Sequence, residues 1–204
     1  MNIVEVSALT FAIQSFVTLF VIMDPPGATP VFLALVADKS PKERIRLAWQ
    51  AAAISLVVIA SFALFGQFVL EYMKVSMEAL QAAGGLLLLY VSLQLLTGRI
   101  DEIDMSTNKN VALVPLGTPL LAGPGAIVAT MIFVKQVQSP EYAIGLIAAV
   151  VAVHITIAIA LMASTKILAI IKDSGVTLVA RIAGLLLAAI AVQMLADAIK
   201  ILAG

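Results

Sequence analysis

The sequence predicts an all-α polytopic membrane protein with six transmembrane helices, arranged as a 3+3 inverted repeat with discontinuous helices 1 and 4. Three observations lead to this prediction. The chain is 62% hydrophobic and 12% charged, with a mean hydropathy of +1.12, which is far outside the range of soluble domains. Proline and glycine interrupt the first and fourth apolar runs. Short motifs of the first half recur in the second half at a nearly constant offset.

The composition and motif content exclude several functional classes. Lys+Arg and Asp+Glu both total 12, so the net charge gives no indication of a nucleic-acid partner. The absence of cysteine excludes disulfides and thiolate metal sites. We find no H-E-x-x-H, G-x-S-x-G, P-loop or pair of intramembrane aspartates. The sequence therefore predicts neither an enzyme nor a cofactor or metal site.

The first apolar run, residues 7–37, contains Asp24-Pro25-Pro26-Gly27. Two consecutive prolines remove two backbone donors, so an ordinary helix cannot continue through them. The pieces on either side would be about 24 Å and about 15 Å long, and the hydrocarbon core of a bilayer is about 30 Å thick. A carboxylate near the midplane costs roughly 2.5–3.5 kcal/mol on insertion scales, so Asp24 needs a partner, a proton or water. The run has no preceding Lys or Arg and no convincing cleavage site, and we expect it to be retained.

The rest of the chain follows in order. Ser40-Pro41, in the polar loop after the first span, is a good helix start. A turn is expected at 172–175, and the polar linker near 98–110 should separate the halves. Further spans are expected at about 46–70, 79–97, 111–134, 142–171 and 179–202.

The repeat depends on three pairs of matching motifs. Pro26-Gly27-Ala28 matches Pro124-Gly125-Ala126 at an offset of 98, and Ser40-Pro41 matches Ser139-Pro140 at 99. The third pair, also at 99, is a Gly-Leu-Leu-Leu segment followed by Gln94 or Gln193. The predicted repeats are residues 1–104 and 105–204. Because each has an odd number of spans, the second must enter the membrane from the opposite side.

Positive charge indicates an orientation. Cytoplasmic loops are enriched in Lys and Arg. Nine such residues follow spans one, three and five, namely Lys39, Lys42, Arg44, Arg46, Arg99, Lys109, Lys166, Lys172 and Arg181, whereas the other side has only Lys74, Lys135 and Lys200. We therefore expect a multi-pass protein of the cytoplasmic (inner) membrane with both termini outside.

The two breaks predict a binding site near the membrane centre. A half-helix that begins inside the bilayer offers unpaired N–H groups to an anion, and the half that ends there offers carbonyls to an ammonium group or a cation. The small residues at both breaks favour a compact ligand. The candidate substrate-binding residues are Asp24, Pro26, Gly27, Ala28, Thr29, Thr118, Gly123, Pro124, Gly125 and Ala126.

Asp24 and two threonines have both a functional and a structural interpretation. Asp24 could pair with a ligand amine, bind a coupling cation or carry a proton, or it could cap the helix that Pro25 begins. Thr29 and Thr118 could bond either to a ligand or to backbone groups that the breaks leave free.

Other polar residues are expected to be mainly structural. Gln94 and Gln193 should join helices by hydrogen bonds, and Gly84-Gly85 should mark a close helix contact. His154, the only histidine, is either a proton relay or a hydrogen-bonded structural residue, and Ser55 occupies its repeat-equivalent position.

Both breaks resemble the signatures of the MarC family of bacterial and archaeal integral membrane proteins. The residues that carry the resemblance are Met23-Asp24-Pro25-Pro26-Gly27-Ala28-Thr29-Pro30-Val31-Phe32 and Pro119-Leu120-Leu121-Ala122-Gly123-Pro124-Gly125-Ala126-Ile127. The resemblance implies transport of small neutral amino acids such as glycine and alanine. Ala28 stands where the family often has Asn, which removes a polar group from the first break.

Two functional hypotheses follow. The first is a secondary transporter for small neutral amino acids that works by alternating access around the breaks, with proton or cation coupling through Asp24 as a separate hypothesis. The alternative is a channel or pore for another small solute or ion, because convergent half-helices also build selectivity filters. The expected partners are a small neutral amino acid, protons or Na⁺ and the lipid bilayer, with no nucleic acid and with an oligomer left open.

Overall fold

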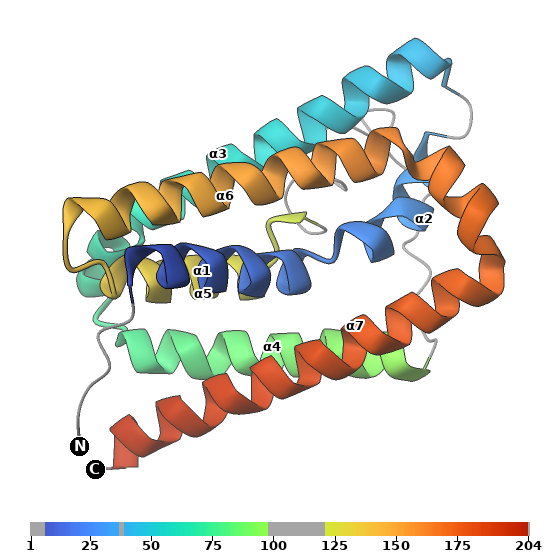
Figure 1. Ribbon diagram of the computed structural model, residues 1–204. Helices are drawn as coiled ribbons and strands as arrows, with labels where there is room; N and C mark the ends of the chain where they lie inside the picture. The colour runs from blue at the N-terminus through green and yellow to red at the C-terminus, as the bar shows by residue number, and fades with distance from the viewer. Residues whose placement is uncertain (1–6, 37–38, 98–120, 204) are drawn as a thin grey trace.

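The structure is a computed structural model that describes residues 7–36, 39–97 and 121–203, and these residues form helices and no strand (Figure 1). The predicted linker at 98–110 and the first part of the predicted fourth span lie outside the described residues. The helices are α1 (Ala8–Met23), α2 (Pro25–Leu35), α3 (Pro41–Met73), α4 (Met77–Thr97), α5 (Pro124–Lys135), α6 (Pro140–Met162) and α7 (Ser164–Ala203).

Several helices begin at a proline, a position where the missing N–H removes no helical hydrogen bond. The start of α3 at Pro41 confirms the prediction from Ser40-Pro41. Ser40 forms a capping box with Glu43, because its hydroxyl accepts from the Glu43 N–H at 3.4 Å and its own N–H donates to Glu43 Oε2 at 2.9 Å. The helix α6 likewise begins at the proline of the matching pair Ser139-Pro140, two residues before the predicted start of the fifth span, although Ser139 makes no side-chain cap.

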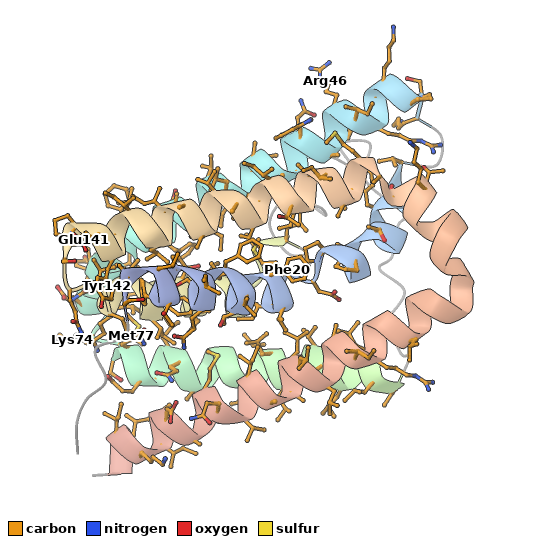
Figure 2. All side chains as sticks on the ribbon, viewed as in Figure 1. Phe20, Arg46, Lys74, Met77, Glu141 and Tyr142 are labelled. Atoms are coloured by element: carbon orange, nitrogen blue, oxygen red, sulfur yellow. The ribbon has the colours of Figure 1, made fainter. Side chains whose placement is uncertain are left out.

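The helices are long and apolar enough for a membrane protein. Five stretches of the described residues qualify as spans, and α5 is a shorter apolar helix. Large apolar side chains point outward along several helices (Figure 2), and the most exposed include Leu64, Phe68, Ile144 and Leu185. In water this surface would be unfavourable, but in a bilayer it contacts lipid. The chain is therefore an integral, multi-pass membrane protein, and its described residues contain five long apolar stretches and a shorter apolar helix.

Antiparallel and parallel helix pairs both occur in the bundle. In Figure 1, α3 runs antiparallel to α6, α1 to α5 and α4 to α7, whereas α1 and α6, which are also in contact, run in the same direction. The beginning of α1 and the end of α7 lie at the same end of the bundle (Figure 1). The largest buried apolar cluster joins α1, α2, α3, α5 and α6, with Leu19, Phe32, Ile59 and Ile157 among its fully buried side chains.

Close contacts at glycine join α4 to α5 and α7, which confirms the interpretation of Gly84-Gly85. A Cβ on Gly84 would lie 2.8 Å from a methyl carbon of Val128 in α5. A Cβ on Gly85 would lie 3.0 Å from the Ala191 carbonyl oxygen in α7. From the other side, a Cβ on Gly184 of α7 would lie 3.1 Å from the Ser92 carbonyl oxygen in α4. Small residues thus allow these backbones to approach closely.

The predicted fifth span is present as α6, but its predicted end at residue 171 and the turn predicted after it are wrong. α6 ends at Met162, and only Ala163 separates it from α7. Residues 172–175 are helical, within an α7 of 40 residues that bends at the side of the bundle (Figure 1). The physical reason is that Ser174-Gly175 weakens a helix by only about 1 kcal/mol, and no proline is present to break it.

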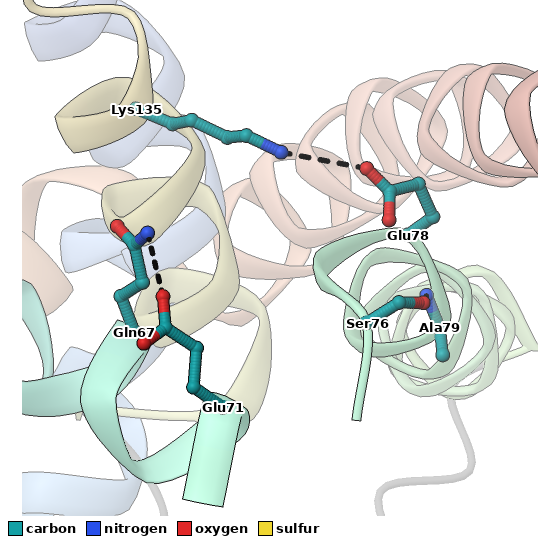
Figure 3. Close-up of polar contacts among 6 residues, drawn as sticks. All are labelled: Gln67, Glu71, Ser76, Glu78, Ala79 and Lys135. Atoms are coloured by element: carbon teal, nitrogen blue, oxygen red, sulfur yellow. Dashed lines mark hydrogen bonds and ion pairs between the residues drawn. The ribbon is translucent and has the colours of Figure 1, made fainter. Parts of the chain in front are cut away.

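Polar contacts gather at the end of the bundle where α3 leads into α4. Figure 2 shows Lys74, Met77 and Glu141 there, and Arg46 near the opposite end. Lys135 Nζ lies 3.4 Å from Glu78 Oε1 and so joins the end of α5 to the start of α4 (Figure 3). This ion pair is largely exposed and links two neighbouring helix ends at the edge of the apolar region.

Candidate functional site

The first spanning helix is broken at Asp24, as the sequence predicts. α1 ends at Met23 and α2 begins at Pro25, with Asp24 between them in the left-handed region at φ 41° and ψ 65°. This conformation costs roughly 1–2 kcal/mol for a residue other than glycine. The Asp24 N–H still donates to the Phe20 carbonyl at 3.1 Å, so α1 keeps its hydrogen bonds up to this residue.

The first turn of α2 has no spare backbone donor. Pro25 and Pro26 lack N–H groups, and the Gly27 N–H donates to Asp24 Oδ1 at 3.2 Å. The Ala28 N–H donates to the Asp24 carbonyl at 3.0 Å. The capping interpretation of Asp24 is thereby confirmed. The expectation that α2 offers unpaired N–H groups to an anion is wrong, because the prolines and Asp24 account for the whole turn.

Gly27 is required by the position of this carboxylate. A Cβ at residue 27 would overlap the Asp24 side chain, since it would lie 2.7 Å from the Asp24 Cγ and closer still to Oδ2. The glycine therefore leaves space for the cap, and Asp24 and Gly27 form one structural unit.

The Thr29 hydroxyl provides a hydrogen bond that the backbone of α2 cannot make. The Pro26 carbonyl would normally accept from the N–H four residues later, but residue 30 is proline and has none. The Thr29 hydroxyl donates to this carbonyl at 2.7 Å instead. Thr29 is buried, so its hydroxyl proton is committed to the backbone, and only its oxygen lone pairs remain available to a ligand.

The start of α5 is the counterpart of this break, and it is built differently. Gly123 is the N-cap without a side-chain hydrogen bond, and its carbonyl accepts from the Ala126 N–H at 3.0 Å and the Ile127 N–H at 3.2 Å. Pro124 has no N–H. A Cβ on Gly125 would lie 2.5 Å from Leu88 Cγ, so packing against α4 requires this glycine.

The structure brings residues from both breaks into one region. Met23 and Ala28 from the first break and Leu121, Ala122 and Ala126 from the second all belong to the largest buried apolar cluster. Thr118 lies outside the described residues. The remaining candidates, Asp24, residues 26–29 and residues 123–126, stay predictions as ligand-binding residues.

His154 forms a buried link between α3 and α6. Its Nδ1 lies 2.7 Å from the Val150 carbonyl oxygen, and its Nε2 lies 3.2 Å from the Ser55 hydroxyl. Because a carbonyl can only accept, Nδ1 carries a proton, and for a neutral ring the Ser55 hydroxyl donates to Nε2. The hydrogen-bonded interpretation of His154 is confirmed. The signal that could have predicted the pair is the offset of 99 between the two residues.

The expectation for Gln193 is wrong. Its amide donates to both carboxylate oxygens of Asp197 at 2.9 Å, one turn further along α7, and Gln193 is exposed. The side chain therefore stabilises its own helix through an i, i+4 contact, and within the described part of the chain it has no hydrogen bond to another helix.

These features define a polytopic α-helical membrane protein whose first spanning helix is broken at a partly buried carboxylate. A family model described as "MarC family integral membrane protein" matches residues 9–203. The chain therefore belongs to the MarC family, also designated UPF0056, as the two signatures indicated.

Relatives from archaea and bacteria cover almost the whole chain. A UPF0056 membrane protein of Pyrococcus abyssi is 35% identical over 196 residues, which are 94% of each chain. One from Methanocaldococcus jannaschii is 34% identical over 200 residues, 94% of this chain and 97% of the relative. The UPF0056 membrane protein YhcE of Escherichia coli is 25% identical, covering 91% of this chain and 90% of its own. No solved structure matches the chain significantly.

Proposed function

We propose that this protein is a secondary transporter for small neutral amino acids, such as glycine and alanine, and that it works by alternating access around two broken helices. The observation that carries the proposal is the break at Asp24, which places a left-handed residue and a carboxylate inside a membrane-spanning stretch, Ala8–Thr29. Such a break is costly in lipid and is typical of transporter binding sites. Membership of the MarC family supports a membrane function.

The proposal includes a 3+3 inverted repeat of residues 1–104 and 105–204, with helices 1 and 4 discontinuous. Equivalent contacts support it. Gly85 faces Ala191 and Leu195 of α7, whereas Gly184 faces Ser92 and Leu96 of α4, and each residue of one set lies 99 positions from its counterpart. Reciprocal contacts of this kind are the property of a two-fold axis.

A second contact supports the same axis. Ser55 and His154 are separated by 99 residues and hydrogen-bond to each other, as two equivalent residues do when they lie on a two-fold axis. The antiparallel course of α3 and α6 agrees with an axis in the membrane plane (Figure 1). In alternating access, each half would then adopt in turn the packing that the other half has on its side of this two-fold axis.

The proposed substrate follows from the chemistry of the two breaks. At the α1–α2 break every donor of the first turn is absent or used, so its oxygen atoms favour the ammonium group of an amino acid. The start of α5 has no side-chain cap, so the positive end of its dipole favours the carboxylate. The Ala28 and Ala126 side chains are small, which favours glycine and alanine. A proton or Na⁺ is proposed as the coupling ion.

We place the protein in the cytoplasmic or inner membrane, with both termini outside. The distribution of Lys and Arg between the two sets of loops supports this orientation.

The test of this function is uptake of radiolabelled glycine and alanine by the purified protein in liposomes. We expect saturable uptake that small neutral amino acids compete for, and counterflow when the liposomes are preloaded with unlabelled substrate. Uptake that does not saturate and shows no counterflow would support a channel instead. Folded protein with no uptake above empty liposomes would refute the assignment.

A further inference from the structure

The last carbonyl groups of α1 have lost their helical hydrogen-bond donors. In a helix each carbonyl accepts from the N–H four residues later. For Val21 and Ile22 those residues are Pro25 and Pro26, which have no N–H. For Met23 the residue is Gly27, whose N–H donates to Asp24 Oδ1. The last three carbonyl oxygens of α1 therefore lack the backbone N–H donors that a continuous helix would provide.

Ordinary helix ends lie in water, which satisfies such carbonyls, but this one lies inside a membrane-spanning stretch. The Ile22 carbonyl can receive neither an α-helical nor a 3₁₀ hydrogen bond, because the residues three and four positions later are both proline. Met23 is buried, and Val21 and Ile22 are partly buried. The break thus concentrates acceptors where few donors are available.

Asp24 adds a negative charge to these carbonyls. One of its oxygens, Oδ1, caps α2, and the other, Oδ2, has no hydrogen bond to any residue that the structure describes. No fully buried side-chain oxygen among the described residues lacks a partner, so Oδ2 keeps some accessible surface. Among these same residues Asp24 has no ion pair with a Lys, Arg or His side chain. Among the described residues, then, the carboxylate has no positive partner of the kind that an intramembrane carboxylate needs.

The second break does not repeat this arrangement. At the offset of 98 that relates the two Pro-Gly-Ala motifs, Asp24 corresponds to Ala122 and Pro25 to Gly123. Gly123 and Ala122 supply no negative charge. The two breaks have therefore diverged, and only the first combines a carboxylate with orphaned carbonyls.

We propose that the end of α1 is a binding site for one monovalent cationic group, held by Asp24 Oδ2 and by the carbonyl oxygens of Val21, Ile22 and Met23. An all-oxygen set suits a hard cation, and a single carboxylate balances a single charge. The cationic group is either an inorganic ion such as Na⁺ or the ammonium group of an amino acid. The site deepens the proposed transport function, but cation binding can be measured when no transport takes place.

The test is equilibrium binding of radiolabelled sodium to the purified full-length protein in detergent, at mildly alkaline pH, with choline as the replacement cation. A parallel series measures binding of radiolabelled glycine with methylammonium as competitor. Asp24→Asn removes the charge and should weaken binding of the cationic group about thirtyfold or more.

A second variant tests the carbonyls separately from the carboxylate. Pro26→Ala restores an N–H that can donate to the Ile22 carbonyl, and we expect it to weaken binding about tenfold. Two matched controls make the same chemical changes elsewhere. Asp197→Asn alters a carboxylate of α7 that Gln193 already holds, and Pro30→Ala restores a donor to a carbonyl that Thr29 already satisfies. Both controls should bind like the original protein, and circular dichroism verifies the fold of each variant.

The binding results distinguish an inorganic cation from the ammonium group of the substrate. Saturable sodium binding without amino acid, lost in Asp24→Asn, assigns the site to an inorganic cation. No sodium binding, with glycine binding that methylammonium inhibits and Asp24→Asn abolishes, assigns it to the substrate ammonium. The proposal is overturned if neither ligand responds to Asp24→Asn in folded protein, or if the controls lose as much binding. Loss of transport alone would concern the proposed function and not this site.

Discussion

Replacing Gly27 with alanine tests whether Asp24 and Gly27 form one unit. The new methyl group would lie 2.7 Å from the Asp24 Cγ, well inside van der Waals contact. The backbone of residue 27 cannot retreat easily, because its N–H is the donor to Asp24 Oδ1 and it lies in the first turn of α2. The carboxylate must therefore move away and give up the cap.

The expected magnitude is the balance of two opposing effects. Losing a hydrogen bond to a charged group destabilises a protein by about 1.5–3 kcal/mol. Alanine in place of glycine stabilises a helix by up to about 1 kcal/mol. Gly27→Ala should therefore lower the free energy of unfolding by about 0.5–2 kcal/mol.

The assay is unfolding of the purified protein by SDS, followed by far-UV circular dichroism, for the two single variants and the double variant. In an Asp24→Ala background the clash disappears, so Gly27→Ala should there be neutral or stabilising. An equal loss of stability in both backgrounds would refute the coupling between the two residues.

Two further predictions use the same unfolding measurement. Thr29→Val should lower the free energy of unfolding by about 1–3 kcal/mol, because it leaves the Pro26 carbonyl without a donor. Adding Pro30→Ala supplies an N–H to this carbonyl and should recover most of the loss. If the double variant recovers nothing, the Thr29 hydroxyl does not stabilise the helix in this way. Gly85→Ala and Gly184→Ala should each cost about 1–3 kcal/mol through overpacking. Similar costs are expected at the two positions, and a large effect at only one of them would argue against equivalent packing.

The first break could be predicted from sequence because proline chemistry is local. Pro25 and Pro26 exclude a continuous helix whatever the rest of the chain does, and the structure separates α1 and α2 at Asp24. The same holds for the starts of α3 and α6 at Pro41 and Pro140. The family was likewise predicted correctly, because its two signatures coincide with the breaks.

Other features depend on tertiary context and could not be predicted. The junction of α6 and α7 at Ala163 has no glycine or proline, and Ser164-Thr165, typical of helix starts, was its only local signal. Conversely, Ser174-Gly175 suggested a turn but lies within α7. The cap that Asp24 provides, by contrast, was one of the interpretations made from the sequence, because Pro25 and Pro26 have no N–H and Gly27 supplies the first donor after them. The placement of Thr118 beside the second break stays a prediction, because this residue lies outside the described residues.

The central claim is that substrate binds at the break between α1 and α2, and labelling of a single cysteine tests it most directly. The chain contains no cysteine, so Ala28→Cys introduces a unique thiol beside the break, and Gln138→Cys provides a control at an exposed position between α5 and α6. The measurement is the rate of modification by a small thiol reagent in proteoliposomes, with and without saturating glycine. We predict that glycine slows the reaction at residue 28 and leaves the control unchanged. An unchanged rate at residue 28, in protein that transports glycine, would contradict the placement of the site.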